Sequence, residues 1–414
     1  MHEEIGSAFP RRIQIQTHNR CNYACSMCPY PATALDTKAA WMDDELYRGI
    51  LEQIEQSGQT VTLCLMLQNE PMVDKRFVDF VRQAHAIDNI KAIATVTNGS
   101  RLGHEVLDEL ATFPRFQLTV SINATDQRRY LQVHGRDRWD RVHEVLTTWE
   151  GDRSQVVVSS VVGSDDVEAG NRFRHYWSER GYSVRLLPYS TRAGTKGDDR
   201  VMQQVEEDYG YCSYPVETLT LRWDGEALLC CQDWSHDETF GSLANQSIAE
   251  LWNGPAMKSL RRDALGGKLR ERASCKGCDY PMRSSQRLAL DHRLRGEPRP
   301  ASSGAPVLPH RSEIRDEQGQ RRPMVVFDID SSEGVIQGFV GEGTAVPRGP
   351  VEARIAIGYR GEFVIDRPAE VWCSGLVEAA GEVQNEMQPV RLTLDRSHRA
   401  YDFFGWYAAD WRNA

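Results

Sequence analysis

Apolar residues recur at two different spacings along residues 12 to 200, and the two spacings alternate. Short, largely apolar runs of strand length are separated by segments whose apolar residues recur every three or four positions, as on one face of a helix. The strand-like runs are RIQIQT, VTLCLML, KAIATVT, FQLTVSI, SQVVVSSVV and SVRLLPY, which begin at residues 12, 61, 91, 116, 154 and 183. This alternation predicts six βα-like units and therefore a parallel sheet, either open or closed into a barrel.

The segments between these strands carry the spacing of amphipathic helices. They cover residues 42–58, 76–87, 103–113, 138–150 and 171–181. Gly58 is the expected stop of the first helix. In folds of this kind, chemistry lies at the carboxyl ends of the strands. A cysteine-rich loop follows the first strand directly, at the place where a functional site is expected.

The pattern changes after about residue 204, so we expect a barrel-like domain over residues 10–204 and a smaller domain over 205–282. Within the second, LTLRWDGEALLCC predicts a hairpin turned at Asp224 and Gly225. The segment that follows Ser247 predicts a helix with that serine as its N-cap. Residues 283–323 are basic, rich in Pro and Ser and without periodicity, which indicates a linker. Strict alternation over 324–414 predicts an all-β domain, with a sandwich as the expected arrangement.

Composition narrows the classes of function. The net charge of −10 disfavours a nucleic-acid partner, because phosphate binding needs a basic surface. The first residues lack the apolar stretch of a signal peptide, and no stretch approaches the roughly 18 apolar residues of a membrane span. We therefore expect a cytoplasmic protein without membrane association. Ten cysteines in a reducing compartment are metal ligands or buried thiols more often than disulfides.

Three cysteines, Cys21, Cys25 and Cys28, lie within the ten residues CNYACSMCPY. Four soft ligands would complete a zinc site, and a [4Fe–4S] cluster also takes four thiolates in its closed form. With three thiolates, one iron stays open to a small-molecule ligand. A zinc site completed from elsewhere in the chain and surface thiols are the alternatives.

The Cys-x3-Cys-x2-Cys spacing after the first strand resembles the signature of radical S-adenosylmethionine (SAM) enzymes. The resemblance implies that SAM chelates the open iron through its amino and carboxylate groups. It also implies reductive cleavage of SAM to methionine and a 5′-deoxyadenosyl radical, which takes a hydrogen atom from the substrate. The cofactor then carries the chemistry, and the protein supplies position and exclusion of water. The resemblance covers roughly residues 10–282 and implies a partial (β/α)6 TIM-like barrel.

The same resemblance assigns residues near SAM at the ends of several strands. LQNEP at 67–71 resembles a Gly-Glu-Pro motif, so Glu70 would accept a hydrogen bond from the SAM ammonium, although Asn69 stands where Gly is usual. Ser121 and Asn123 would lie near the ribose, and Asn98 ends the third strand. Arg192, in TRAGT, belongs to a loop near the adenosine. Ordinary strand-end capping is the alternative for Asn98, Ser121 and Asn123. These candidate cofactor-binding residues are Asn69, Glu70, Asn98, Ser121, Asn123 and Arg192.

A second set of cysteines follows the barrel. Cys212, Cys230, Cys275 and Cys278 suit an iron–sulfur cluster or structural zinc. Their order resembles the SPASM/twitch extension of radical SAM enzymes, in the shorter twitch form with one auxiliary [4Fe–4S] cluster. Cys231 is adjacent to Cys230, and neighbouring strand residues face opposite ways, so one of the two binds the cluster. The Gly-x4-Cys spacing favours Cys230, which leaves Cys231 as a core residue or a hydrogen-atom donor.

The twitch form resembles enzymes that oxidise a secondary alcohol of a sugar or an aminocyclitol. The leading hypothesis is therefore hydrogen-atom abstraction from a carbinol carbon, giving dehydrogenation or epimerisation of a sugar-like small molecule. Modification of a ribosomally made peptide is the first alternative, and a non-catalytic zinc-binding interaction protein is the second. The radical mechanism implies a reductant protein such as flavodoxin or ferredoxin. The sequence assigns no catalytic residue.

Overall fold

The computed structural model describes residues 8–30, 38–163, 166–196, 212, 214–265 and 268–280, and six strands beyond residue 311. The chain divides into two compact units, which are described separately. One comprises residues 7–281 with 292–297, and the other the remaining residues. No helix among the described residues is both long and apolar enough to cross a membrane.

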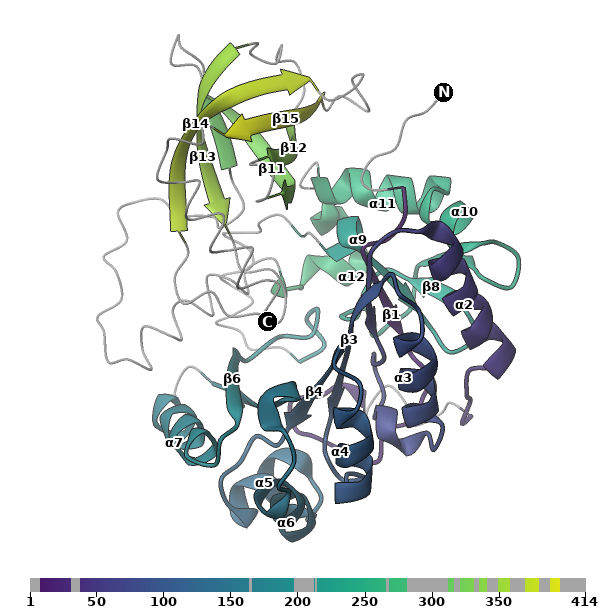
Figure 1. Ribbon diagram of the computed structural model, residues 1–414, viewed down its shortest axis with the longest axis vertical. Coiled ribbons are helices and arrows are strands. Elements are labelled where there is room, and N and C mark those ends of the chain that lie inside the picture. The colour runs from purple at the N-terminus through teal and green to yellow at the C-terminus, as the bar shows by residue number, and fades with distance from the viewer. Residues whose placement is uncertain are drawn as a thin grey trace. The chain divides into compact units, whose positions relative to one another are not determined.

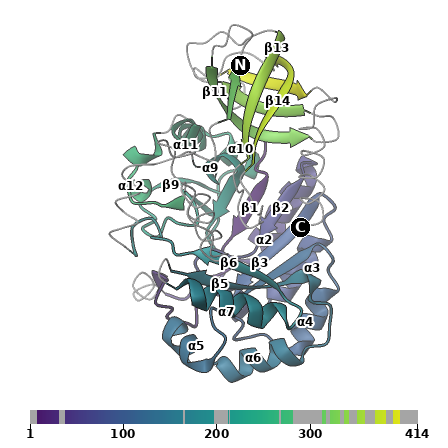
Figure 2. The same cartoon turned by 90° about the vertical axis from the view of Figure 1, so that its left-hand side faces the viewer.

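Among the described residues of the first unit, nine strands form one sheet in the order β6-β5-β4-β3-β2-β1-β7-β8-β9 (Figures 1 and 2). The six predicted parallel strands are all present and pair in sequence order. They are β1 (Arg12–Ile15), β2 (Val61–Cys64), β3 (Ile90–Thr97), β4 (Phe116–Ser121), β5 (Val156–Val162) and β6 (Ser183–Pro188). The mixed α/β architecture with a parallel sheet, predicted from the alternation of spacings, is confirmed.

Helices cover one face of the parallel sheet (Figure 1). They are α2 (Asp44–Ser57), α3 (Phe77–His85), α4 (His104–Ala111), α5 (Gln127–His134), α6 (Trp139–Thr148) and α7 (Val167–Ser178), with short 3-10 turns η1 (Pro71–Val73) and η2 (Arg153–Gln155). The covered face is apolar. In the strand register, Ile13 lies between Leu63 and Leu219 on neighbouring strands, and all three side chains are fully buried. Burial of this face supplies the main stabilisation of the sheet.

Local sequence determines where α2 begins and where it ends. Asp43 accepts a hydrogen bond from the backbone N–H of Glu45 and caps the helix at its start. Gly58 ends it in the left-handed conformation, with φ of 62°, as expected. Tyr47, fully buried in the helix, donates its hydroxyl hydrogen to the carbonyl oxygen of Phe80 at 2.8 Å. This bond joins α2 to α3.

The predicted hairpin is also present, and it extends the barrel sheet. β7 (Thr218–Leu221) and β8 (Glu226–Leu228) pair antiparallel around Gly225, which has φ of 80°. β9 (Thr239–Ser242) pairs with β8. β7 also pairs in parallel with β1, from Arg12 opposite Thr218 to Ile15 opposite Leu221. The smaller region is therefore continuous with the sheet of the barrel.

Helices of the smaller region follow this hairpin. They are α9 (Tyr214–Glu217), α10 (Ile248–Trp252), α11 (Pro255–Leu265) and α12 (Ala273–Lys276), with the 3-10 turn η3 (Leu269–Glu271). The single helix expected after Ser247 is interrupted between Trp252 and Pro255, because proline cannot continue a helix but suits its first turn. Ser247 caps α10 as predicted, in a reciprocal capping box with Glu250.

The second unit contains β10 (Ser312–Arg315), β11 (Arg321–Asp330), β12 (Val335–Val340), β13 (Gly349–Ile357), β14 (Ala369–Ala379) and β15 (Gln388–Leu394). These strands pair antiparallel in a closed barrel, in the order β10-β11-β12-β15-β14-β13, whereas two packed sheets were expected. Alternation specifies which residues share a face, but closure depends on pairing between distant strands. The closing strand β10 lies within the segment 283–323 that the sequence indicated as a linker.

Candidate functional site

The cysteine loop lies directly after β1, as predicted, and its three thiols are half-buried. Burial and the neighbouring thiols raise the pKa of Cys21 and of Cys25 to about 12 each. These mutual effects show that the thiols lie close to one another. A thiolate is the form that binds iron, so loading of the loop must release protons.

The C-terminal end of α5 holds this loop in place. The backbone N–H of Ser26 donates to the carbonyl oxygen of Val133 at 2.9 Å. Gly135 follows in the left-handed conformation, and a Cβ atom there would lie 2.9 Å from the carbonyl oxygen of Ala24. Only glycine fits at this position without displacing the loop.

His134 contacts the loop through its side chain. Its Nε2 atom lies 2.9 Å from the carbonyl oxygen of Ile122, so Nε2 carries the hydrogen, and Nδ1 faces the Cys25 sulfur at 3.3 Å. Burial lowers the pKa of His134 to about 4, so the ring is neutral. The structure thus places a neutral imidazole against a thiol of the cysteine loop.

Glu70 lies at the end of β2 and is 3% exposed. Burial raises the pKa of its carboxyl group to about 7, although three hydrogen bonds oppose this shift. The donors are the Thr97 hydroxyl at 2.6 Å and the backbone N–H groups of Asn98 at 2.7 Å and Met72 at 3.2 Å. A buried carboxylate of this kind is completed by a cationic partner such as an ammonium group.

Asn98 and Asn69 flank this carboxylate. The Asn98 amide donates to the side-chain oxygen of Asn22 at 2.9 Å, which ties the end of β3 to the cysteine loop. Asn69 accepts from the backbone N–H of Leu67 at 3.1 Å. Its Nδ2 atom is buried without a hydrogen-bond partner, although a buried donor normally has one. The unpaired group marks a place where a ligand acceptor would fit.

Ser121 and Asn123 lie together at the end of β4. The Asn123 amide donates to the Ser121 hydroxyl at 2.9 Å, and its oxygen accepts from the backbone N–H of Val161 at 2.8 Å. Asn123 adopts the left-handed conformation, with φ of 55°. These bonds join β4 to β5, so the strand-end capping kept as an alternative is present in the structure. A ligand role for the pair stays a prediction.

Arg192 follows β6 and also has a positive φ, of 51°. Its backbone N–H donates to the Ser190 hydroxyl at 3.3 Å. The structure thus brings this loop to the carboxyl end of the sheet with the other candidates, and it leaves the predicted contact of Arg192 with adenosine untested.

The face of the sheet opposite the helices carries many polar side chains, beside the apolar Cys64, Ala94 and Val157. Strand register places the following residues on it: Gln14, Thr119, Ser121, Ser159, Arg185 and Thr220. Gln16, two residues beyond Gln14, points the same way. The Gln16 Oε1 and Thr220 Oγ1 atoms are buried without hydrogen-bond partners. Buried polar atoms normally have hydrogen-bond partners, so these two oxygen atoms are places where polar groups of a ligand would bind.

Five cysteines of the smaller region lie near one another: Cys212, Cys230, Cys231, Cys275 and Cys278. Burial, together with the nearby Cys275 and Cys231 thiols, raises the pKa of Cys212 to about 12. Burial raises the pKa of the Cys230 thiol, and each of the other four thiols also raises it. The structure therefore brings together the four predicted auxiliary ligands and Cys231, although four thiolates close a cluster.

The contacts of the adjacent pair differ. The backbone N–H of Gln232 points at the Cys230 sulfur at 3.4 Å, as the N–H of Tyr280 points at that of Cys278. The Cys231 sulfur accepts instead from the side-chain amide of Gln232 at 3.6 Å. The nearby Tyr214 hydroxyl donates to Gln14 Oε1. Both sulfurs therefore accept from Gln232, and the ligand role of Cys230 stays a prediction.

The side chains present fit the implied cofactors. Grouped thiols suit iron–sulfur clusters, and the buried Glu70 carboxylate beside the unpaired Asn69 amide suits an amino-acid head group. No three described His, Cys, Asp or Glu side chains converge on a point suited to a single metal ion.

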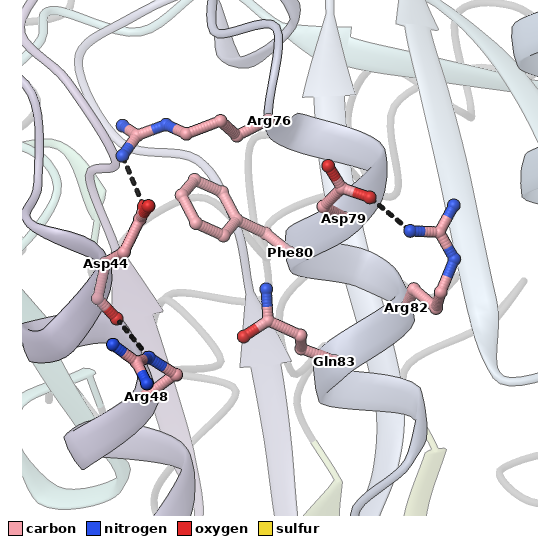
Figure 3. A pocket seen from close by; sticks show the side chains of 7 residues that line it. All are labelled: Asp44, Arg48, Arg76, Asp79, Phe80, Arg82 and Gln83. Carbon is pink, nitrogen blue, oxygen red and sulfur yellow. Dashed lines mark hydrogen bonds and ion pairs between the residues drawn. The ribbon is translucent and has the colours of Figure 1, made fainter.

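A surface cavity of about 310 Å³ lies between α2 and α3 (Figure 3). Two of its arginines form ion pairs, Arg76 with Asp44 and Arg82 with Asp79. It is lined by Asp44, Arg48, Arg76, Asp79, Phe80, Arg82 and Gln83. The cavity shares no residue with the cysteine loops.

Sequence reasoning missed several residues of this arrangement. Gln14 and Gln16 alternate with isoleucines in RIQIQT, so their period of two was a usable signal for a polar inner face. Thr97, Tyr214 and Asp279 carried no comparable signal, because their partners lie far away in the sequence.

Comparisons with known proteins agree with this geometry. Residues 15–163 match the radical SAM superfamily, and residues 212–279 match SPASM, an iron–sulfur cluster-binding domain. A GTP 3′,8-cyclase of Shewanella denitrificans is 27% identical over 195 residues, 44% of this chain and 55% of the cyclase. The chain thus spans about half the length of this curated relative.

A solved structure with a TM-score of 0.50 shows the same fold at low identity. SuiB of Streptococcus suis, bound to the precursor peptide SuiA, is 14% identical with a TM-score of 0.50, covering 69% of this chain and 74% of SuiB. BtrN in complex with AdoMet and 2-DOIA is 18% identical with a TM-score of 0.47, covering 67% of this chain and 94% of BtrN. The two matched domains imply a [4Fe–4S] cluster, an auxiliary cluster and SAM as cofactors. The chain therefore contains a radical SAM domain followed by a SPASM iron–sulfur cluster-binding domain.

Proposed function

We propose that this enzyme abstracts a hydrogen atom from a carbinol carbon of a small, hydroxyl-rich substrate and thereby oxidises or epimerises it. The observation that carries the proposal is the polar inner face of the barrel, where the Gln16 and Thr220 oxygen atoms are buried without partners. A sugar or an aminocyclitol would supply the missing hydrogen bonds, and each unmet bond in the free protein favours binding of such a ligand.

In this proposal, the strand ends bind SAM. Glu70 accepts from the SAM ammonium, and Asn69 and Asn98 line the same end of the sheet. Ser121, Asn123 and Arg192 contact the rest of the nucleoside. Cys21, Cys25 and Cys28 hold a cluster that supplies the electron for cleavage of SAM. The buried surroundings of these residues exclude water from a reactive radical.

The fate of the substrate radical decides the reaction. A carbinol radical that loses one proton and one electron becomes a ketone, and a second cluster held by Cys212, Cys230, Cys275 and Cys278 would accept that electron. This is the twitch arrangement. If the radical instead receives a hydrogen atom on the opposite face, the product is an epimer, and the Cys231 thiol is a candidate donor.

The proposal includes a low-potential electron donor such as flavodoxin or ferredoxin, and a cytoplasmic location. The acidic chain, with a net charge of −10, supports the absence of a nucleic-acid substrate. Modification of a ribosomally made peptide is the competing function. The experiment below separates the two.

The test measures 5′-deoxyadenosine formed by anaerobically reconstituted enzyme with SAM and a strong reductant. Sugar and aminocyclitol mixtures are compared with peptide mixtures, and a variant with Cys21, Cys25 and Cys28 changed to Ala serves as the blank. Product that rises only with the sugar mixtures is expected. A rise only with peptides would overturn the substrate class and leave the radical chemistry intact.

A further inference from the structure

The loop after β6 contains three consecutive residues in the left-handed region. Arg192, Ala193 and Gly194 have φ values of 51°, 55° and 84°. Non-glycine residues avoid this region, and they keep it only where surrounding contacts determine the backbone. The loop therefore needs an external constraint, and the structure shows where it comes from.

Asp279 supplies that constraint from the smaller region. Its side chain is fully buried, and its Oδ1 atom accepts from the hydroxyls of Ser190 and Thr191, each at 3.0 Å. Its Oδ2 atom accepts from the backbone N–H of Thr191 at 3.1 Å. The carboxylate thus binds the two residues immediately before the strained turn, and charged acceptors make such bonds strong.

Asp279 directly follows Cys278, one of the auxiliary thiols. Cys275 and Cys278 form a tight turn, in which the backbone N–H of Cys278 donates to the carbonyl oxygen of Cys275 at 3.1 Å. The carbonyl oxygen of Gly277, within this turn, also lies 3.0 Å from the Thr191 hydroxyl, whose single hydrogen is shared between this carbonyl and Asp279. The Cβ position of Gly194 lies 3.4 Å from the Cα atom of Gly277. The cysteine turn and the strained loop are therefore packed backbone against backbone.

We propose that Asp279 couples the auxiliary cluster to SAM binding. A cluster on Cys275 and Cys278 fixes the turn that carries Asp279. Asp279 in turn holds the Arg192 loop in its strained conformation at the carboxyl end of the sheet. Asp279 is a positioning residue here, since it acts through the loop and touches neither cofactor. The inference rests on the proposed function, which places SAM at these strand ends.

Coupling of this kind is reciprocal and measurable. Loss of the auxiliary cluster should weaken SAM binding about 5- to 10-fold, and the D279N substitution should do the same while both clusters remain. Asparagine keeps the shape of the side chain but replaces one acceptor oxygen with a donor, so one of the bonds to Ser190 or Thr191 is lost.

The experiment is a thermodynamic cycle on the full-length reconstituted enzyme. Equilibrium dialysis gives the Kd for SAM of the wild type, D279N, the double variant C275A/C278A, and the triple variant. Iron analysis reports cluster content. We expect the double variant to lose affinity in the wild-type background and to lose no more in the D279N background. Additive losses in the cycle would overturn the coupling.

A matched pair at the other end of the contact separates positioning from folding. T191V removes the hydroxyl that bonds Asp279, and T191S keeps it. T191V should weaken SAM binding several-fold with unchanged iron content, while T191S should bind as the wild type does. Equal affinity in the two variants would contradict the proposal. A wild type with both clusters that binds no SAM would instead refute the proposed function.

Discussion

The Oε2 atom of Glu70 accepts a hydrogen bond of 2.7 Å from the backbone N–H of Asn98, and this bond joins the ends of β2 and β3. The start of the cysteine loop belongs to the same arrangement, because the N–H of Glu70 donates to the carbonyl oxygen of Arg20 at 2.9 Å. His18 Nε2 lies 3.0 Å from the carbonyl oxygen of Glu70. One acidic residue thus organises three segments that meet at the proposed SAM site.

The raised pKa of Glu70 predicts a pH dependence of SAM binding. Burial raises this pKa to about 7, so part of the free enzyme carries a protonated Glu70 below neutral pH. The SAM ammonium favours the ionised form, and binding at low pH must therefore release a proton. Affinity should rise with pH and be about tenfold weaker at pH 6 than at pH 7.5. Equilibrium dialysis across this range measures it.

The E70Q variant is the control for this pH effect. Glutamine cannot ionise, so SAM binding should be weak at every pH and should lose the slope between pH 6 and 7.5. A slope retained in E70Q would assign the titration to another group.

Substitution of Gly135 by alanine should selectively reduce binding of the first cluster. G135A forces alanine into the left-handed region and places its Cβ 2.9 Å from the carbonyl oxygen of Ala24, between two cluster cysteines. Gly58 is the matched control, since its φ of 62° is similar and a Cβ there meets no atom within 4 Å. Both variants should lose about 1–2 kcal/mol of stability from the backbone conformation. Only G135A should also bind less iron after reconstitution.

Equal iron content in G135A and G58A would show that the cysteine loop adjusts freely, and that the contact with α5 does not position it. The iron-to-protein ratio and the visible absorbance of the reconstituted proteins distinguish these results.

Much of this arrangement could be predicted from particular residues. The runs around Leu63 and Val158 specify parallel strands, because strands buried on both sides are rich in apolar residues. The spacing of Cys21, Cys25 and Cys28 predicts an iron–sulfur loop at a strand end. Pairing of β7 with β1 could not be predicted, since partners 200 positions apart leave no local pattern. Closure of the second unit through β10 escaped prediction for the same reason.

Variants of Cys230 and of Cys231 should differ in their iron content. Two [4Fe–4S] clusters hold about eight iron atoms per chain. The Gly-x4-Cys spacing favours Cys230 as the ligand, so C230A should leave about four iron atoms and C231A should retain about eight. Iron analysis and electron paramagnetic resonance of the reduced proteins check this. Retention of eight iron atoms in C230A alone would exchange the roles of the two residues.

Removal of the Tyr47 hydroxyl should lower the stability of the protein at a site remote from both clusters. Y47F leaves the buried carbonyl of Phe80 without this donor and should cost about 1–3 kcal/mol. T112A removes an exposed hydroxyl bond to the Glu109 carbonyl and should change stability by less than about 0.5 kcal/mol. Anaerobic thermal unfolding compares the two. A Y47F midpoint no lower than that of T112A would contradict the assigned role of the bond.

The strand β7 has one more consequence. It belongs to the region that matches the SPASM domain, yet it is the hydrogen-bonded neighbour of β1, the strand that leads into the first cysteine loop. Excision of residues 212–280 would turn β1 into an unprotected sheet edge, and such edges recruit other chains. The auxiliary region is thus part of the same sheet as the barrel and cannot be removed without exposing β1. An attempt to transplant it, or to produce the barrel alone, should yield aggregated protein rather than a smaller enzyme.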